Sequence, residues 1–373
     1  MRLAYFTESL PPLTDGVART YTWLAEFLNH RGIDFRFYSP CLPAEAEPWR
    51  GRVKPMPYVR LPLYDYYRVG LPWGRGLSAD LDAFKPDLVQ VAVPTPLAFA
   101  GQSYALRHKI PLVSSYHTHF AHYLPYYHLG ALARPGWAFL RSFHNRGART
   151  YAPSPSAAGE LRSHGFTHVD LWERGLDAKR FSPKHKSVAE RARWAGPKEA
   201  LLLYVGRLVA DKDLRVLAES LELLRAKGLR VRCVFAGDGP LKAELQARLP
   251  QDHFPGFVRG LALSQLYASA DLFVFPSTNE TFGNVVLEAL ASGLPVLAAA
   301  AGGPADIIRS GSNGLLARPK DAAHLAGLAA KILKQASQRR RLKAQGLVTA
   351  ARYHWHAVHG RLLEDYRALI AGA

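Results

Sequence analysis

Cysteine is nearly absent from this chain: its 373 residues include only Cys41 and Cys233. The two cysteines lie far apart, and neither belongs to a Cys/His spacing typical of a metal site. A disulfide-stapled fold and a zinc module are therefore excluded as the basis of the structure. We interpret both cysteines as small buried thiols in a reducing compartment.

Long apolar runs are missing as well. No uninterrupted apolar stretch approaches the roughly 20 residues that a membrane-spanning helix needs. The opening residues, MRLAYFTESLPPLTDG, carry one positive charge and a short apolar run that is interrupted by Glu8, Pro11 and Pro12. This pattern predicts a first strand and a turn rather than a signal peptide, so we expect a cytoplasmic protein.

Acidic residues are the third shortage. The chain has 30 Asp and Glu against 48 Lys and Arg, a formal net charge of +18. Such an excess attracts nucleic acid, anionic lipid headgroups or phosphorylated small molecules. Because no zinc-finger spacing or aromatic RNA-reading motif accompanies the charge, we expect no nucleic-acid partner. An anionic membrane surface and a merely solvated arginine-rich surface both remain open.

The chain does contain a regular alternation of short apolar runs with longer amphipathic runs. This alternation is typical of parallel sheets with crossover helices, and the length favours two domains. We therefore predict an α/β protein with two doubly wound domains. The expected strands are 2–7, 34–39, 87–93, 111–118 and 169–173 in the first half, and 200–206, 231–237, 272–277 and 295–300 in the second.

A charged stretch with few apolar residues marks the domain boundary. We assign residues 1–176 to the first domain, 177–198 to a linker and 199–354 to the second domain. A helical tail at about 355–373 need not stay with the second domain. Ligands of doubly wound sheets bind beyond the carboxyl ends of the strands, so we expect a site in a cleft between two facing domains.

Candidate site residues follow several of these strands. Arg207 and Lys212 flank a loop where a guanidinium and an ammonium can hold a diphosphate. Gly16 lets a strand-to-helix turn approach a ligand closely, and His117 would lie at the rim of the cleft. Taken singly, each has an ordinary explanation: a solvated surface pair, a tight turn or a structural histidine.

Two glutamates stand out in the apolar stretch 277–298, STNETFGNVVLEALASGLPVLA. Glu280 precedes a predicted helix, and Glu288 lies about one turn into it. Carboxylates accept hydrogen bonds from sugar hydroxyls, and amides at a helix start attract negative charge. A glutamate at a helix start is also ordinary helix chemistry, so neither residue is decisive alone.

The remaining clusters of candidate metal ligands suggest no metal geometry, and we expect no metal site. The carboxylate pairs are interpreted as solvated side chains, and the histidines suggest no specific coordination. These residues are Asp80, Asp82, Asp211, Asp213, His119, His122 and His128.

Together the motifs resemble a known family. ETFGNVVLEALASGLPVLA resembles the Glu-x7-Glu motif of retaining nucleotide-sugar-dependent glycosyltransferases of the GT-B fold, which has two Rossmann-like domains facing a central cleft. YVGRLVADKD resembles their Gly-Arg-Leu…Lys loop, TESLPPLTDGVARTY their first glycine loop and HTHF their histidine loop. The resemblance runs in order from residue 1 to past residue 350, and it is closest to GDP-mannose-dependent alpha-mannosyltransferases.

The resemblance implies four catalytic residues. His117 would contact the transferred sugar and support the developing charge, and Glu280 would hold the sugar. Arg207 and Lys212 would neutralise the departing diphosphate, so that neither a metal nor another cofactor is required.

Donor binding would extend to further matching positions. Gly16 would approach the donor phosphates, the amides of Thr281, Phe282 and Gly283 would hold the sugar, and Glu288 would bind the ribose hydroxyls. The tail around Trp355 resembles the helix that crosses back to the first domain in this family. Two positions depart from the family pattern: His119 replaces an expected aspartate, and Asp15 replaces a frequent asparagine.

The implied reaction transfers a hexose, which we expect to be mannose from GDP-mannose, to a lipid or glycan acceptor with formation of an α-glycoside. The base pocket would involve Val258 and Arg259, whose residue types do not separate guanine from uracil. The segment 120–150 mixes aromatic residues, leucines and arginines as an interfacial helix does, which suggests peripheral attachment to the inner face of a membrane. A helix packed on the first domain with a basic outer face explains this segment equally well.

Three alternatives remain open. One is a UDP-sugar-dependent glucosyl-type glycolipid glycosyltransferase, which would share the mechanism. The second is a sugar-nucleotide epimerase, and the third is a non-catalytic binding protein of the same fold.

Overall fold

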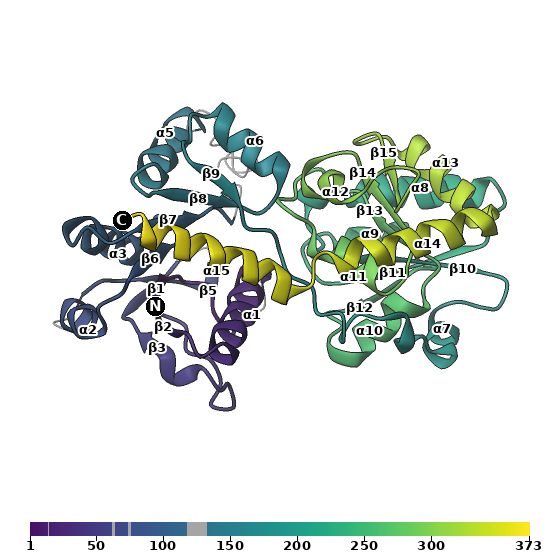
Figure 1. Ribbon diagram of the computed structural model, residues 1–373. Coiled ribbons are helices and arrows are strands. Elements are labelled where there is room, and N and C mark those ends of the chain that lie inside the picture. Colours follow the sequence, from purple (N-terminus) through teal and green to yellow (C-terminus); the bar gives the residue numbers. More distant parts are fainter. Residues whose placement is uncertain (14, 62–63, 74–75, 118–132) are drawn as a thin grey trace. The chain divides into compact units, whose positions relative to one another are not determined.

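The computed structural model describes residues 1–373 except 14, 62–63, 74–75 and 118–132. The chain divides into two units, shown in Figure 1. Unit 1 comprises Met1–Gly175 and Trp355–Ala373, and unit 2 comprises Leu176–His354. Each unit contains a parallel sheet with helices on both faces, which confirms the predicted α/β class.

The sheet of unit 1 has the strand order β3-β2-β1-β6-β7-β8-β9, and all its pairs are parallel. A separate antiparallel ribbon pairs β4 with β5. The strands are β1 (Arg2–Phe6), β2 (Asp34–Ser39), β3 (Val53–Pro55), β4 (Tyr58–Leu61), β5 (Tyr64–Gly70), β6 (Leu88–Val91), β7 (Leu112–Ser115), β8 (Arg149–Ala152) and β9 (Val169–Leu171).

Helices cover both faces of this sheet because its strands are apolar on both sides. Leu3 and Tyr5 of β1 pack towards α1 and α15, whereas Ala4 and Phe6 pack towards α2, α3 and α5. The C-terminal tail folds as helix α15 within unit 1. The helices are α1 (Gly16–His30), α2 (Gly76–Phe84), α3 (Pro96–Arg107), α5 (Ala133–His144), α6 (Pro155–Ser163) and α15 (Trp355–Ala371), with a 3-10 turn η1 (Arg50–Arg52).

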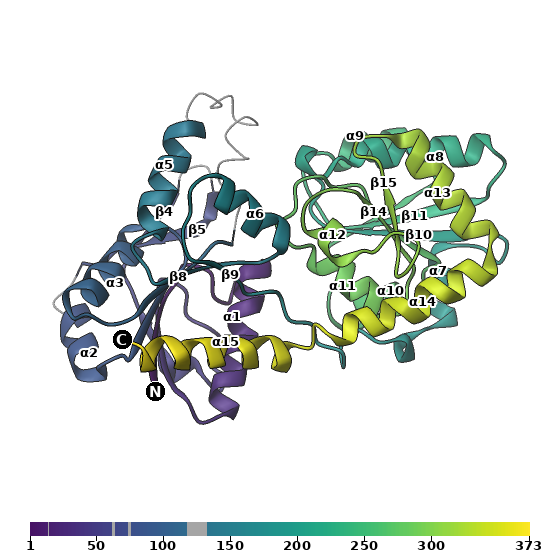
Figure 2. The ribbon, with the colours of Figure 1, turned by 45° about the horizontal axis from the view of Figure 1, so that its top comes forward.

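The sheet of unit 2 has the order β12-β11-β10-β13-β14-β15. Figure 2 shows α8, α9 and α13 on one face and α7, α10, α11 and α14 on the other. The strands are β10 (Ala200–Val205), β11 (Val231–Ala236), β12 (His253–Gly256), β13 (Leu272–Phe275), β14 (Val296–Ala299) and β15 (Leu315–Ala317). The helices are α7 (Val188–Trp194), α8 (Leu214–Ala226), α9 (Lys242–Arg248), α10 (Gly260–Ser269), α11 (Asn284–Ala291), α12 (Gly302–Ile307), α13 (Ala322–Lys334) and α14 (Ala336–Ala351), with 3-10 turns η4 (Pro183–His185) and η5 (Ala210–Lys212).

The predicted linker 177–198 is corrected by the structure. This stretch folds as part of unit 2, where Phe181 and Ala195 are buried in the hydrophobic core. Its helix α7 is anchored where the amide of Ser187 donates to Ser269 Oγ at 2.9 Å. The composition did not reveal that this stretch packs on unit 2, because two buried side chains are enough to hold a short, mostly charged segment on a domain.

Glu8 is a buried carboxyl just after β1, with 1% of the residue exposed. Its Oε1 accepts a hydrogen bond from the Thr95 hydroxyl at 2.5 Å, and its Oε2 has no partner among the described residues. Burial raises the pKa of Glu8 to about 7 from an ordinary 4.5. The folded state thus binds this proton more tightly than the unfolded chain, and the resulting stability is lost as pH rises from 4.5 through about 7.

We predict that Glu8→Gln stabilises the protein at pH 8 by on the order of 2–3 kcal/mol and changes little at pH 4.5, because one pKa unit corresponds to about 1.4 kcal/mol. Glutamine keeps the shape and the acceptor for Thr95 but cannot ionise. Denaturant unfolding at the two pH values measures the difference. Glu45→Gln, at an exposed position, is the matched control, and an equal gain at both pH values would contradict the prediction.

Candidate active site

The order of strands places two loops of unit 2 side by side. In chain order the sheet runs third, second, first, fourth, fifth, sixth, so the crossovers reverse direction between β10 and β13. These two strands are parallel neighbours, and Leu202 lies opposite Leu272. Loops 206–213 and 276–283 therefore leave the sheet at the same edge, at the switch point where open α/β sheets bind ligands.

Lys212 is the centre of the polar cluster that these loops form. Its Nζ donates to Glu280 Oε1 at 2.7 Å and to the carbonyl of Asn279 at 3.2 Å. The same Nζ lies 3.3 Å from Asp211 Oδ2, which is 3.9 Å from an Nη of Arg207. Arg207, Lys212 and Glu280, which the sequence singled out, are therefore close together in this cluster. The carboxylate of Asp211 lies between the two cations. Lys212 is buried, whereas the Arg207 side chain is half exposed.

Asp211 and Asp213 correct the expectation of solvated carboxylates. Asp211 is buried beside Lys212. Asp213 adopts a left-handed conformation with φ of 52°, and its Oδ2 accepts hydrogen bonds from the amide and hydroxyl of Thr278 at 2.9 and 2.6 Å. Spacing along the chain could not reveal this because Thr278 belongs to the loop after another strand. The contact ties the two loops together.

The loop before α11 presents main-chain donors. Gly283 is the N-cap of α11 with φ of 92°, a conformation that favours glycine, and no side chain caps this helix. Behind the loop, the amide of Gly303 donates to the carbonyl of Glu280 at 2.9 Å. A Cβ on Gly303 would lie 2.2 Å from Phe282 Cα, so this glycine sets how closely the two segments pack. Thr281, Phe282 and Gly283 directly follow Glu280 in this loop and lead into α11.

Glu288 lies deeper than Glu280. It is 3% exposed, and its Oε2 accepts a hydrogen bond from the hydroxyl of Tyr267 at 2.9 Å. Tyr267 comes from α10 and was not singled out in the sequence, since an apolar helix position gives no hint of this role. The carboxylate is therefore held in place by a buried phenol.

The predicted base pocket lies on the loop after the edge strand β12. Val258 is half buried and Arg259 is exposed. The neighbouring Phe257, which sequence reasoning missed, is 63% exposed, and the Arg259 guanidinium lies 5.8 Å from its ring centroid. An exposed aromatic ring with a nearby cation is a surface on which a planar base can stack.

In unit 1, His117 follows β7 and is buried. Its Nδ1 lies 2.9 Å from an Nη of Arg174, and its Nε2 lies 3.2 Å from the Tyr21 hydroxyl. Burial, assisted by the charge of Arg174, lowers the pKa of His117 well below its usual value. His117 is therefore a neutral ring held by protein groups on both nitrogens.

Gly16 is exposed at the first position of α1, at the same edge of unit 1's sheet as His117. Asp15 caps this helix: its Oδ1 accepts from the amides of Val17 and Ala18, both at 2.8 Å. A carboxylate thus already occupies the place where these two amides could meet an anion. His119, His122 and His128 lie outside the described residues.

Comparisons with known proteins place this architecture in a family. The model of the glycosyl transferases group 1 family matches residues 189–347, and that of glycosyltransferase family 4 matches 14–180. A GDP-mannose-dependent alpha-mannosyltransferase of Corynebacterium glutamicum is 34% identical over 100% of this chain and 90% of its own length. The chain belongs to the glycosyl transferases group 1 family.

Further similarities agree with this assignment. A protein of the same name from Mycobacterium tuberculosis is 35% identical over 99% of this chain and 97% of its own length. The sulfoquinovosyl transferase SQD2 of Arabidopsis thaliana is 33% identical over 92% of this chain and 66% of its own length. Among solved structures, sucrose-phosphate synthase from Thermosynechococcus elongatus has a TM-score of 0.77 over the full length of both chains at 22% identity, which shows a shared fold. The GT-B fold and the glycosyltransferase class expected from the sequence are confirmed.

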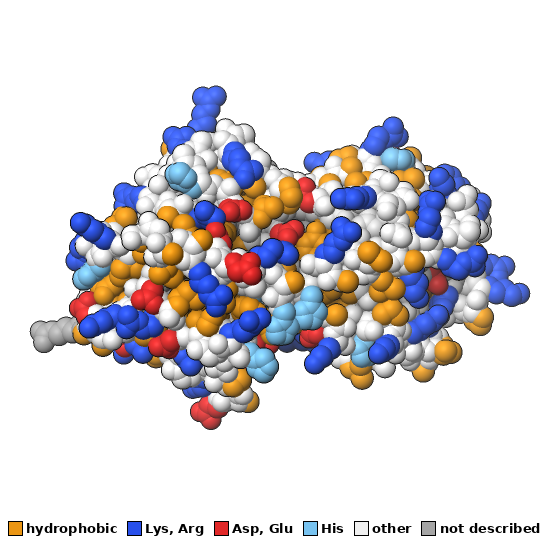
Figure 3. Space-filling view, viewed as in Figure 1, with side chains coloured by type: hydrophobic (Ala, Val, Ile, Leu, Met, Phe, Trp, Pro, Cys, Tyr) orange, Lys and Arg blue, Asp and Glu red, His pale blue; other side chains and the backbone are white. Residues whose placement is uncertain are grey.

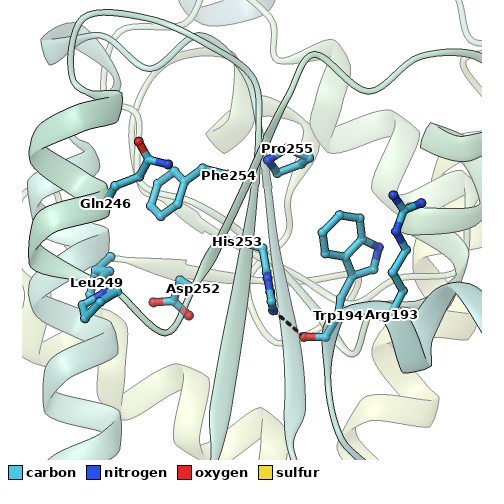
Figure 4. A pocket seen from close by; sticks show the side chains of 9 residues that line it. Arg193, Trp194, Gln246, Leu249, Asp252, His253, Phe254 and Pro255 are labelled. Carbon is cyan, nitrogen blue, oxygen red and sulfur yellow. Dashed lines mark hydrogen bonds between the residues drawn. The ribbon is translucent and has the colours of Figure 1, made fainter.

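The glycosyltransferase also has an open cavity of about 480 Å³ away from these loops. Figure 4 shows it lined by side chains of α7, α9 and β12, where His253 Nε2 donates to the carbonyl of Trp194 at 2.9 Å. It brings together none of the predicted site residues. Within the described ranges, no group of three or more His, Cys, Asp or Glu side chains is arranged to hold a metal ion.

We predict that Lys212→Ala lowers glycosyl-transfer turnover at least about tenfold, the usual order for loss of one charge-stabilising group. The variant would leave Glu280 and Asp211 facing each other without the ammonium between them. Initial-rate kinetics with a nucleotide-sugar donor measure the effect. Lys227→Ala, at an exposed position after α8, controls for loss of a lysine, and wild-type turnover in Lys212→Ala would show that the cluster is only structural.

Proposed function

We propose that this glycosyltransferase transfers mannose from GDP-mannose to a hydroxyl of a lipid or glycan acceptor, with retention of the anomeric configuration. The observation that carries the proposal is the Arg207–Lys212–Glu280 cluster at the switch point of unit 2. Relatives named GDP-mannose-dependent alpha-mannosyltransferases, which match nearly the full chain, support the choice of donor.

The residues of the cluster have complementary tasks in this reaction. Arg207 and Lys212 stabilise the diphosphate as the bond between the sugar C1 and the phosphate oxygen breaks. Glu280 and the amides before α11 hold the sugar hydroxyls, and the carboxylate of Glu288 accepts hydrogen bonds from the ribose. The acceptor oxygen forms the new bond to C1 on the same face, and its proton passes to the leaving diphosphate. The protein cations and amides supply the charge compensation, so we expect turnover without a divalent metal.

A UDP-sugar donor is the second candidate, because a relative named for a transferred group other than mannose is also similar to this chain. SQD2, named a sulfoquinovosyl transferase, is about as similar to this chain as the mannosyltransferases are. The exposed ring of Phe257 on the base loop can stack on either base because stacking depends on the flat face rather than on the ring substituents.

Calorimetric titration with GDP and with UDP in the presence of EDTA distinguishes the two donors. We expect GDP to bind at least about tenfold more tightly, a difference of about 1.4 kcal/mol in binding free energy. Product analysis with GDP-mannose then identifies an α-mannoside. Tighter binding of UDP would mean that the donor is a UDP-linked sugar rather than GDP-mannose. Formation of an epimerised nucleotide sugar, or nucleotide binding without any transfer, would overturn the glycosyl-transfer proposal.

We further propose that helix α5 attaches the enzyme to an anionic membrane surface. Leu140 and Phe143 bury one side of the helix in unit 1, whereas Phe139 is 51% exposed on a helix that also carries the exposed Arg134 and Arg141. A helix that exposes both an aromatic ring and basic side chains suits the interface of an anionic bilayer. Within the described ranges, no helix is both long and apolar enough to cross a membrane.

The net positive charge by itself does not single out α5. Figure 3 shows Lys and Arg side chains spread over the visible face of both units rather than gathered in one stripe. The combination of exposed aromatic and basic residues is what distinguishes this helix. A general electrostatic attraction would depend on the charge of the whole surface instead.

We predict that Phe139→Ser combined with Arg141→Glu weakens binding to vesicles containing anionic lipid at least about fivefold, because apolar burial and electrostatic attraction both contribute to interfacial binding. Vesicle co-sedimentation measures the affinity. The matched control combines Val348→Ser with Arg340→Glu on the outer face of α14, which makes the same change in charge. An equal loss in both double variants would assign binding to general charge.

A further inference from the structure

Arg174 meets His117 at the carboxyl edge of the sheet in unit 1. His117 directly follows β7, and Arg174 follows β9. One Nη of Arg174 lies 2.9 Å from His117 Nδ1. Because a guanidinium has only donors, Nδ1 must be the acceptor, and the ring proton resides on Nε2. That Nε2–H then donates to the Tyr21 hydroxyl at 3.2 Å.

Arg174 is unusual because it is a buried cation without an ion-pair partner among the described residues. It is 4% exposed, and its other Nη has no hydrogen-bond partner among the described residues. No acidic side chain of the described residues lies within ion-pair distance of it. Burial lowers the pKa of Arg174 to about 10, so it remains a cation at neutral pH. A buried cation without a paired carboxylate costs free energy, and a neutral side chain would fill the same space more cheaply.

The groups around the pair keep the histidine neutral. Tyr21 of α1 and Trp172, just after β9, pack edge-on against the imidazole, with ring centroids 5.5 and 5.7 Å away. Asp15, the N-cap residue of α1, acts on the guanidinium, and His144 of α5 acts on the imidazole. The buried His359 of α15 is also coupled to Arg174, and burial lowers the pKa of His359 to about 3. His144 is itself buried, and burial lowers its pKa to about 3. Among the described residues, no carboxylate therefore acts on His117 to stabilise its protonated form.

We propose that Arg174 is a positioning residue for glycosyl transfer: it locks His117 in the neutral Nε2–H tautomer and in one ring orientation. This inference rests on the proposed function only for its kinetic consequence, since the tautomer is a property of the protein alone. With Nδ1 occupied by a cation, His117 cannot accept a proton during the reaction. It contributes a fixed dipole at the strand end rather than acid or base catalysis.

The tautomer is measured directly on the full chain with ¹⁵N-labelled histidine, in spectra that correlate the imidazole nitrogens with the ring carbon-bound protons. Loss of one signal set in His117→Gln assigns the residue. We expect a single Nε2–H form of His117 that does not titrate between pH 5.5 and 8. A wild-type Nδ1–H tautomer, or titration in that range, overturns the proposal without any measurement of transfer.

Variants then test whether Arg174 acts through His117. In Arg174→Met we expect a mixture of tautomers, a His117 that titrates at a higher pH and a kcat at least about tenfold lower. KM for the donor should change less than about threefold. Arg174→Lys keeps one donor and should restore the Nε2–H form and part of kcat. Arg361→Gln, which removes an exposed ion pair with the adjacent Glu173, is the matched control and should retain wild-type kinetics.

A double-mutant cycle separates positioning from a general structural role. If Arg174 acts through His117, the double variant His117→Gln/Arg174→Met loses no more kcat than the more damaging single variant. Additive losses would overturn the proposal, as would a fall in kcat with an unchanged His117 tautomer. If Arg174→Met does not fold, Arg174→Lys and the wild-type spectrum decide the outcome. Should transfer prove absent from the wild type, the proposed function fails, while the tautomer measurement still tests this contact.

Discussion

The parallel pairing of β10 with β13 is the constraint on which the site of unit 2 depends. It places side by side two loops whose residues are 68 positions apart at the Lys212–Glu280 contact. The polar contacts then follow: Lys212 reaches Glu280, and Asp213 bonds to Thr278. Charge-assisted hydrogen bonds therefore join the two loops at the sheet edge, where the main chains no longer pair as strands.

Glycine supports this arrangement from behind. The backbone of Gly303 lies against Phe282, and a Cβ on Gly237 would lie 1.8 Å from the carbonyl oxygen of Gly206. In both places the segment after one strand packs on the segment after the neighbouring strand without intervening side chains. The positions of the amides before α11 are thus determined by backbone contacts, which restrict movement more tightly than flexible side chains do.

The two units hold their charged groups in different ways. In unit 2 the buried ammonium of Lys212 faces two carboxylates, so its charge is balanced locally. In unit 1 the buried guanidinium of Arg174 faces the neutral imidazole of His117, whose other ring nitrogen meets the hydroxyl of Tyr21. The first arrangement suits exchange of partners with a diphosphate. The second keeps a positive potential in place, because no carboxylate of the described residues lies within ion-pair distance of Arg174.

The sequence by itself determined the α/β class and the motifs after β7, β10 and β13, because apolar periodicity and short motifs are local properties of the chain. It missed short strands such as β8 and β12, whose four residues pair only because neighbouring strands offer open ladders, and it mistook 177–198 for a linker. Only the tertiary structure decided that Tyr267 holds Glu288 and that Arg174 holds His117. Each of these contacts joins residues from separate elements, so their geometry depends on strand order and helix packing, which spacing along the chain does not encode.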